Sequence, residues 1–548
     1  MKIVEIRELD GPNLFLLRPA IKLEIDLEGD QPQVAEPLAQ SFVLEPEMSP
    51  LPAAGLTTVS SERVMSLLTE IVHVIHDRIG HPRPDVVSRS MEAQNHLAVA
   101  FGWTHRKMGT GIAKLAFSIL DGDVSDLEQS LARLRELAGS EPGEDDRPEM
   151  LADRDRHLPV IGITGTNGKT TTTRLIASIL MRAGKKVGWT SSAGVYIQTD
   201  MVIEGDYTGP AGAARVFEEP GVDIAVLETA RGGILMRGLG YESNDICVVT
   251  NVSPDHLGLH GVYTVEGLAE VKSIVARVTR PDGFVVLNAH DSRVLAMRDH
   301  TRARHFLIAR DADNEETRHH IAGGGWALVV DNGEIVWSHD GVRDVLTAVN
   351  DVPIAFGGRA THMLENALCA GAACLAIGLP IDQVRSGLSA FRNRSSQNRG
   401  RLNVYDVQGT TIIVDFAHNE LGLKHLLGFA RTFVESGGRL IAVVGTAGDR
   451  ADDVLLALGR IAADDADLVI AKDTTKYLRG RESGEILALI ERGIRESGKT
   501  GYETATSETS AFERARELAR EGDVVAVMCI EDYDTIIPQL EKIGRSLS

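Results

Sequence analysis

Gly162-Ile163-Thr164-Gly165-Thr166-Asn167-Gly168-Lys169-Thr170 is the stretch that decides the fold. An apolar run of strand type, residues 158–163, comes before it, and residues 171–181 carry apolar side chains at helical spacing after it. A glycine-rich turn between a strand and a helix that ends in Gly-Lys-Thr is typical of a phosphate-binding loop. The sequence therefore predicts a nucleotide site, with ATP as the nucleotide.

Each residue type in this loop has a physical use. Gly165 and Gly168 let the backbone turn its N–H groups toward phosphate oxygens, at the positive end of the following helix. Lys169 offers a cation to the β- and γ-phosphates, and Thr170 offers a hydroxyl to Mg²⁺. The common pattern begins with a glycine where this chain has Ile163, so a tight turn without a ligand is the alternative. The predicted nucleotide contacts in the loop are Gly165, Thr166, Asn167, Gly168, Lys169, Thr170 and Thr171.

Composition limits the class of protein. With 57 Lys and Arg against 78 Asp and Glu, the chain has a net charge of −21, which disfavours binding to nucleic acid. The charged N-terminus does not resemble a signal peptide, and the longest apolar stretch, residues 367–381, is too short to span a bilayer. We expect a soluble cytoplasmic protein that binds no membrane. The four cysteines lack the spacing of a metal site or disulfide framework and are expected to be buried thiols: Cys247, Cys369, Cys374 and Cys529.

The chain of 548 residues is long enough for three or four domains. Residues 1–140 are predicted to form an α+β domain, with a half-buried strand at 21–27, a loop or mobile segment at 31–55 and helices from 62 to 137. Residues 141–157 are rich in charge and poor in apolar side chains, as in a linker. His73 and His76 lie at helical spacing, but two ligands are too few for a metal site.

Apolar strands alternate with helical patterns through the rest of the chain, which favours an α/β fold with mostly parallel sheets. Residues 158–396 are predicted to form a central ATP-binding domain that ends in an antiparallel hairpin around Asn332-Gly333. Residues 397–548 are predicted to form a Rossmann-like domain. The predicted strands are 223–227, 245–249, 283–287 and 304–308 in the first, and 412–416, 440–444, 467–471 and 524–528 in the second.

Two polar groups follow predicted strands of the central domain. Glu228 ends one strand, and Asn251 ends the next, followed by Asp255 and His256. Ligands collect at the carboxyl ends of strands in an open α/β sheet, so Glu228 is well placed to hold the Mg²⁺ that Thr170 also reaches. A surface carboxylate at 228 and a structural acid–histidine pair at 255–256 are the alternatives.

At this point the residues match a family. The chain resembles the Mur ligases over residues 158–545, and within them the ligase half of the cyanophycin synthetases. The opening residues 9–13 are also similar to the N-terminal domain of those enzymes. The motifs that carry the resemblance are Thr164-Gly-Thr-Asn-Gly-Lys-Thr170, Glu204-Gly-Asp-Tyr-Thr-Gly-Pro210, Glu228-Thr-Ala-Arg-Gly-Gly233, Asn251 with Asp255-His256, Lys272, His362-Met-Leu-Glu-Asn366, Arg401, Asp415-Phe-Ala-His418-Asn419 and Gly448-Asp-Arg450.

The resemblance implies an ATP-dependent ligase. A substrate carboxylate would attack the γ-phosphate to form an acyl phosphate, and an amine would then displace phosphate to give an amide. The implied catalytic residues are Lys169, Glu228, His256 and Lys272. Two Mg²⁺ ions are implied, one on Thr170 and Glu228, the other on His256 and on Lys272 if it is carbamylated; an unmodified Lys272 is the alternative. Further implied nucleotide contacts are Asn251, Asn366, Arg401 and Asp415, and weaker candidates for substrate contact are Thr208, Arg231 and His418.

One departure from the resemblance is large. Cyanophycin synthetases insert an ATP-grasp domain where this chain has the charged segment before residue 158, so we expect a single ligation centre. The carboxylate is expected to be an amino acid or peptide-like, and the resemblance favours a homo-oligomer, a dimer. Two other interpretations stay open: a non-catalytic partner of a separate ATP-grasp or amidotransferase protein, and a P-loop ATPase.

Overall fold

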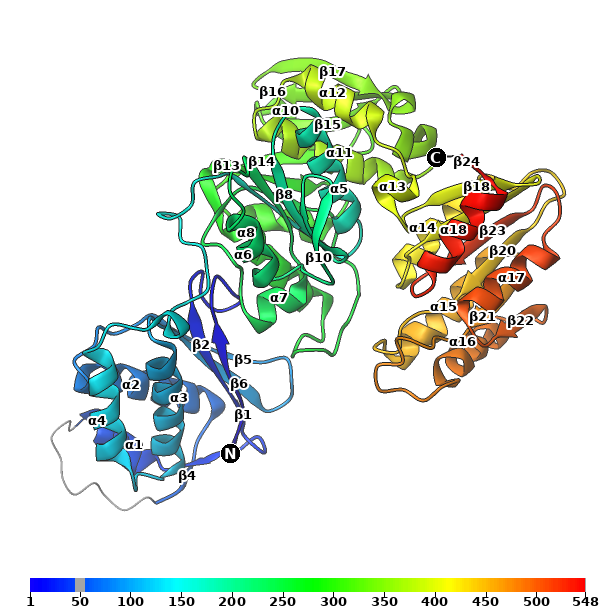
Figure 1. The fold of residues 1–548 in the computed structure, drawn as a ribbon. Coiled ribbons are helices and arrows are strands. Elements are labelled where there is room, and N and C mark those ends of the chain that lie inside the picture. Colours follow the sequence, from blue (N-terminus) through cyan, green and yellow to red (C-terminus); the bar gives the residue numbers. More distant parts are fainter. Residues whose placement is uncertain (45–54, 548) are drawn as a thin grey trace.

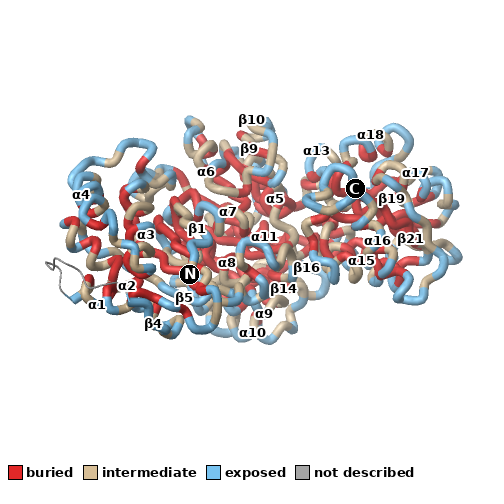
Figure 2. Tube along the Cα trace, turned by 90° about the horizontal axis from the view of Figure 1, so that it is seen from below, coloured by how far each residue is buried: buried red, intermediate tan, exposed pale blue. Residues whose placement is uncertain are grey.

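The computed structural model describes residues 1–44 and 55–547. Three large sheets follow one another along the molecule, the N-terminal sheet at one end and the C-terminal sheet at the other (Figure 1). The buried parts of the chain follow these sheets, and the exposed parts cover the outer helices and loops (Figure 2). No helix in the described residues is long and apolar enough to cross a membrane.

The N-terminal sheet is antiparallel, in the order β1-β2-β6-β5. Helices pack on it through a core of apolar side chains such as Ile21, Leu68 and Ile112. The elements are β1 (Lys2–Leu9), β2 (Ala20–Asp26), β3 (Gln33–Val34), α1 (Glu36–Leu44), β4 (Thr57–Thr58), α2 (Ser61–Arg78), β5 (Val86–Ser90), β6 (His96–Gly102), α3 (Arg106–Asp121), α4 (Leu127–Ala138) and a short 3₁₀ helix (Glu144–Asp146).

Some predictions for this region are wrong. The expected run of helices from 62 to 137 is interrupted by β5 and β6, because the apolar run of β6 is buried almost throughout and carries no helical or strand period. Strand β2 is buried on both faces, since Lys22 pairs with Glu24 at 2.6 Å on the face expected to be solvated. Helix α1 occupies part of the segment expected to be a loop, and residues 45–54 lie outside the described residues.

The central sheet has the order β10-β9-β8-β11-β7-β12-β13-β14-β15-β16-β17. The strands from β8 to β15 in this order are parallel, and the antiparallel pairs at both edges include the hairpin predicted around Asn332-Gly333. The strands are β7 (Val160–Thr164), β8 (Val187–Ser191), β9 (Gly194–Ile197), β10 (Asp200–Glu204), β11 (Ile224–Glu228), β12 (Asn244–Val249), β13 (Thr279–Asn288), β14 (Arg304–Ala309), β15 (Trp326–Asp331), β16 (Glu334–His339) and β17 (Val342–Ala348).

Helices cover both faces of the central sheet (Figure 1). One apolar cluster joins the sheet to α5, α11 and α12, and a second joins the opposite face to α6, α7, α8 and α9. The mostly parallel α/β prediction is therefore confirmed. The helices are α5 (Lys169–Arg182), α6 (Pro210–Phe217), α7 (Arg231–Met236), α8 (Val265–Arg277), α9 (Ser292–Ala296), α10 (Glu315–Ala322), α11 (Thr361–Ala376), α12 (Ile381–Ala390) and α13 (Ser395–Asn398), with 3₁₀ helices at Met297–His300, Val349–Asp351 and Pro353–Gly358.

The C-terminal sheet has the order β22-β21-β20-β23-β19-β18-β24, and its first five strands are parallel, as in a Rossmann-like fold. Helices α14, α15 and α16 pack on one face, and α17 and α18 on the other. The elements are β18 (Asn403–Val407), β19 (Thr410–Asp415), α14 (Glu420–Arg431), β20 (Leu440–Val444), α15 (Asp452–Asp465), β21 (Leu468–Lys472), α16 (Glu485–Glu496), β22 (Tyr502–Ala505), α17 (Glu508–Leu518), β23 (Val524–Met528), α18 (Tyr533–Ile543) and β24 (Arg545–Ser546).

Candidate active site

The phosphate-binding loop joins the carboxyl end of β7 to the start of α5. Gly165 and Gly168 have φ angles of 144° and 88°, which side chains rarely tolerate. A Cβ atom at Gly165 would lie 1.9 Å from Thr250 Oγ1, and one at Gly168 would lie 2.2 Å from Asn366 Oδ1. Both glycines are therefore required by conformation and by close neighbours.

Two lysines converge on this loop. Lys169 Nζ donates to the carbonyl oxygens of Gly165 and Thr166 at 3.1 and 2.9 Å, and Lys272 Nζ of α8 donates to Gly165 O at 2.7 Å. Lys272 is buried, and burial together with the nearby charge of Lys169 holds its pKa well below its usual value. Lys272, a predicted site residue although it lies 107 residues after Gly165 in the sequence, therefore contacts the loop directly.

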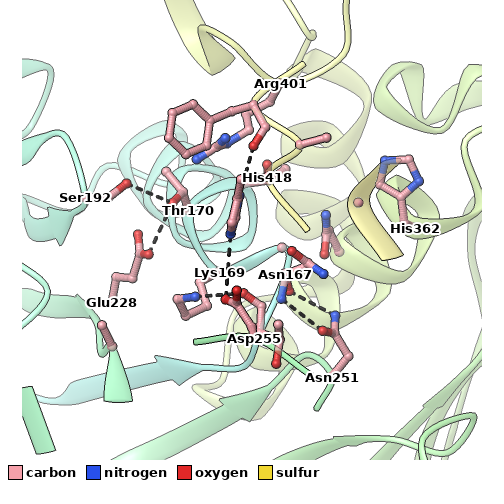
Figure 3. A pocket seen from close by; sticks show the side chains of 18 of the residues that line it. Asn167, Lys169, Thr170, Ser192, Glu228, Asn251, Asp255, His362, Arg401 and His418 are labelled. Atoms are coloured by element: carbon pink, nitrogen blue, oxygen red, sulfur yellow. Dashed lines mark hydrogen bonds and ion pairs between the residues drawn. The ribbon is translucent and has the colours of Figure 1, made fainter. Parts of the chain in front are cut away.

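Glu228 lies at the end of β11, which pairs with β7 so that Glu228 is opposite Ile163. Thr170 Oγ1 donates to Glu228 Oε1 at 3.2 Å and lies 3.4 Å from Ser192 Oγ (Figure 3). Glu228 Oε2 is buried without a hydrogen-bond partner among the described residues, and burial raises the pKa of this carboxyl while Lys169 opposes the shift. A buried, unpartnered carboxylate oxygen beside a threonine hydroxyl fits a hard cation such as Mg²⁺.

Asn251 and Asn366 lie on the other side of the loop. Asn251 Oδ1 accepts from the backbone N–H of Asn167, and its Nδ2 donates to Asn167 O, both at 2.9 Å. Asn251 therefore fixes the shape of the loop. Asn366 projects from α11 toward Gly168 and lines the same cavity.

The C-terminal part of the chain supplies the opposite wall. Arg401 lies 4.4 Å from the ring centroid of Phe416, and Asp415 Oδ2 accepts from the backbone N–H of Leu402 at 2.8 Å. Desolvation lowers the pKa of Arg401 and raises that of Asp415, although the charge of each opposes the shift of the other. Arg401 and His418 face the phosphate-binding loop (Figure 3).

A cluster of charged side chains beside this wall joins the central and C-terminal parts of the chain. Arg450 Nη1 lies 2.6 Å from His256 Nδ1, and Asp449 Oδ2 lies 3.3 Å from the same nitrogen. Burial lowers the pKa of His256. Burial alone would raise the pKa of Asp255, but His418, Arg450 and His256 hold it well below its usual range. His256 therefore contacts the C-terminal part directly.

The cavity between these walls has a volume of about 250 Å³. Every predicted site residue lines it except Gly165, whose carbonyl oxygen accepts from Lys272. The weaker candidates Thr208, Arg231 and His418 are among the lining residues, and Arg231 also donates to Leu259 O at 3.2 Å.

Sequence reasoning missed several residues in or beside this cavity. His362, Asn419 and Arg450 lie within the quoted motifs, so a signal for them was present. Asp206 and Asp449 also lie within quoted motifs, whereas Ser192 and His425 come from segments far apart in the chain that carry no motif of their own. The residues missed are Ser192, Asp206, His362, Asn419, His425, Asp449 and Arg450.

Within the described part of the chain, no three His, Cys, Asp or Glu side chains converge closely enough to hold a metal ion. His73 Nε2 lies 3.2 Å from the carbonyl oxygen of Pro84, and His76 Nδ1 lies 2.9 Å from that of Val72.

The fold and the cavity define a P-loop α/β protein whose nucleotide site is closed by a second, Rossmann-like sheet. Two family models match the sequence: Mur ligase middle domain over residues 163–374, and Mur ligase, glutamate ligase domain over residues 400–529. UDP-N-acetylmuramoyl-L-alanyl-D-glutamate--2,6-diaminopimelate ligase of Geobacter metallireducens is 30% identical over 409 residues, which cover 69% of this chain and 75% of that protein. The chain belongs to the Mur ligase family.

Cyanophycin synthetase of Trichormus variabilis is 40% identical over 377 residues, which cover 68% of this chain but 41% of that protein. The chain thus matches about two fifths of the length of these relatives. Among solved structures, E. coli FolC in complex with DHPP and ADP superposes with a TM-score of 0.52 at 20% identity, over 70% of this chain and 89% of that one. This likeness confirms the fold.

Proposed function

We propose that the chain is an ATP-dependent ligase that joins a carboxylate to an amine and releases ADP and phosphate. The observation that carries the proposal is the arrangement of Lys169, Thr170 and the unpartnered oxygen of Glu228 around one cavity. This arrangement suits phosphoryl transfer, where positioning and charge neutralisation supply most of the rate. Family membership favours an amide ligase over other phosphoryl-transfer proteins.

The proposed chemistry has two steps. A carboxylate oxygen of the first substrate attacks the γ-phosphorus, and the bond between that phosphorus and the β–γ bridging oxygen breaks to release ADP. The neutral amine of the second substrate then attacks the acyl carbon, and the bond from this carbon to the phosphate oxygen breaks. The nitrogen loses one proton to solvent, which leaves an amide and inorganic phosphate.

Residues of this chain fit roles in both steps. Thr170 and Glu228 would hold one Mg²⁺, which neutralises phosphate charge when bound. Lys169 would shift from the carbonyl oxygens of Gly165 and Thr166 to the phosphates. Arg401 and Asp415, on the C-terminal wall, would keep water from the acyl phosphate. Asn251 would hold the shape of the loop, and Asn366 would lie near the base of the nucleotide.

The second Mg²⁺ implied by the resemblance rests on His256 and Lys272. The lowered pKa of Lys272 favours the neutral amine, the form that reacts with CO₂ to give a carbamate. However, Arg450 lies at the His256 nitrogen that a metal would need, and Lys272 bonds the backbone of the loop. This arrangement does not fit a second metal, so no step is assigned to it.

Relatives guide the choice of substrate. A bifunctional folylpolyglutamate synthase/dihydrofolate synthase has been solved with Mn, AMPPNP and L-glutamate bound, and other relatives are named as ligases of diaminopimelate. We propose an amino acid as the amine and an amino-acid or peptide-like carboxylate as its partner. We further propose the domain division 1–140, 141–157, 158–396 and 397–548, a cytoplasmic homodimer, and no nucleic acid partner because the net charge is −21.

An ADP-release screen over paired carboxylates and amines tests the function, with Lys169→Ala as the matched control. The ligase predicts ADP release that requires both substrates and is lost in the variant. ATP hydrolysis without an amine would instead indicate a P-loop ATPase. A pair-independent background equal to that of Lys169→Ala would favour a non-catalytic partner and contradict the proposal.

A further inference from the structure

Helix α8, which carries Lys272, begins against the N-terminal part of the chain. Glu92, in the turn between β5 and β6, accepts through Oε2 from the backbone N–H groups of Tyr263 and Thr264, the latter at 2.9 Å. Its Oε1 accepts from Thr264 Oγ1 at 2.6 Å, and this threonine caps α8 by accepting from Gly267 N at 3.0 Å. One carboxylate therefore binds three donors at the start of the helix.

A second contact lies one turn further along. Arg89 of β5 makes a bidentate ion pair with Glu270, with Nη1 2.7 Å from Oε1 and Nη2 2.9 Å from Oε2. Bidentate arginine–carboxylate pairs fix geometry as well as charge. The first two turns of α8 are thus held by two side chains of the N-terminal part.

Gly267 of α8 also lies against the Glu92 carboxylate. A Cβ atom on this helical glycine would lie 2.1 Å from Glu92 Oε1. Gly267 lies in the first turn of α8, where glycine has a lower helix propensity than alanine. The close approach of the Glu92 carboxylate accounts for a residue without a side chain at this position.

Helix α8 connects these contacts to the phosphate-binding loop through Lys272. Lys272 lies two turns after Thr264, about 12 Å along the helix axis at 1.5 Å per residue. Its buried Nζ donates to Gly165 O at 2.7 Å. Because the helix is a rigid connector, a shift at its first turn moves the Lys272 Nζ relative to this oxygen.

We propose that Glu92 and Arg89 are positioning residues for the phosphate site, and that the N-terminal part of the chain thereby sets the position of Lys272. This gives the N-terminal part a role in catalysis that does not require it to touch ATP. The catalytic side of the proposal rests on the ligase function proposed above. Its structural side, the restraint of α8, does not.

The N-terminal part has a separate anchor on the central part. Asp10 is buried, accepts from Arg106 and Arg237 at 2.9 and 2.8 Å, and donates through its backbone N–H to Arg237 O at 2.7 Å. Leu239 N donates to Pro12 O at 2.8 Å beside it. Loss of the Glu92 contact therefore releases α8 without detaching the N-terminal part.

The competing explanation is that apolar packing of α8 alone places Lys272, through Leu268, Val271 and Ile274. Two variants distinguish it. Glu92→Gln keeps the size but presents an amide NH₂ to N–H donors, and Gly267→Ala pushes the flexible Glu92 carboxylate away while improving helix propensity. Asp77→Asn is the control, since Asp77 is an exposed carboxylate of the same part of the chain that pairs with Arg83.

Hydrogen–deuterium exchange of residues 265–277 and the kinetics of ADP release are the measurements. We expect both variants to speed exchange in the first turns of α8 about tenfold. We expect kcat to fall about fivefold or more, because Lys272 holds the phosphate-binding loop and a small displacement of the groups that position the reactants is costly, with KM for ATP changed less than twofold. In a Glu92→Ala background, Gly267→Ala should cause no further loss of kcat. The charge swap that combines Arg89→Glu with Glu270→Arg should recover the activity that either change alone removes. Asp77→Asn should match the wild type.

Unchanged exchange in both variants would mean that core packing alone places α8, and the proposal would be wrong. Faster exchange with wild-type kcat would equally overturn it, because Lys272 would then act without the restraint. If the wild-type protein released no ADP with any substrate pair, the ligase function would fail instead, and exchange alone would decide whether Glu92 restrains α8.

Discussion

Asn167 and Asn419 exchange two side-chain hydrogen bonds, with Nδ2 to Oδ1 distances of 3.3 and 3.1 Å. Asn167 belongs to the phosphate-binding loop, and Asn419 caps helix α14 by accepting from Gly422 N at 2.9 Å. This amide pair connects the nucleotide cradle to the C-terminal part. A shift of the C-terminal part would therefore act directly on the phosphate-binding loop.

Asn419→Ala should weaken ADP binding, because it removes both the amide pair and the helix cap. We expect about a fivefold to tenfold loss in affinity by calorimetric titration, from two neutral hydrogen bonds of modest net value. Asn419→Asp is the informative control, since aspartate caps a helix well but lacks the amide donor. Wild-type affinity in Asn419→Asp would show that the cap alone matters.

Gly168→Ala should abolish nucleotide binding. The change places a methyl group 2.2 Å from Asn366 Oδ1 on a residue with φ of 88°. Gly184→Ala is a matched control, because Gly184 has φ of 83° and open space around it. The control should lose about 1 kcal/mol of stability from the left-handed backbone and keep its affinity for ADP. Equal affinity losses in the two variants would contradict the steric explanation.

Glu228→Gln should stabilise the metal-free protein while removing activity. The folded-state pKa of Glu228 is raised, so ionisation at neutral pH opposes folding, and this penalty grows as pH rises above the unfolded-state value. In EDTA, the variant should melt at a higher Tm than the wild type. With Mg²⁺ and ADP, the wild type should gain Tm and the variant should gain little. A Mg²⁺-dependent gain of the same size in both would rule out Glu228 as a metal ligand.

His362 and His425 should make the protein sensitive to mild acid. Their rings stack with centroids 4.7 Å apart and an interplanar angle of 2°, between α11 and α14. Burial lowers the pKa of His362 to about 3 and that of His425 to about 4; the second histidine and Arg310 add to these shifts, respectively. Depressed histidine pKa values give stability that is present above the unfolded-state value of about 6.5 and is lost as pH falls toward 3 to 4.

The loss has a limiting slope of about 1.4 kcal/mol per pH unit for each proton. Thermal melts of wild type and His362→Gln between pH 7 and 4.5 measure it, and the variant should show the shallower decline. Asp255 and Asp449, whose pKa values are held below their usual range, also contribute stability that falls in acid as the unfolded state takes up protons, but they do so in both proteins. Parallel declines would show that the histidine pair is not the cause.

Much of this molecule follows from sequence because its nucleotide site is built at strand ends. The buried parallel strands are short apolar runs, so the positions of Glu228 and Asn251 after them are readable. Strands β5 and β6 were missed because the apolar run of β6 lacks a period that distinguishes strand from helix. Ser192 and His425 could not be found, since neither chain distance nor local pattern brings them to Thr170 and His362. The contact of Arg450 with His256 depends on how the two sheets are placed, which no local pattern encodes.

The glycine at position 267 has a consequence for how relatives of this chain vary. Its identity is set by a carboxylate that lies far earlier in the sequence, on a part of the chain that other Mur ligases need not share. Homologues that lack Glu92 are free to carry alanine there, whereas in those that keep Glu92 an alanine would displace its carboxylate. An alignment of relatives should therefore show these two positions changing together, as a trace of the N-terminal part in the helix that it restrains.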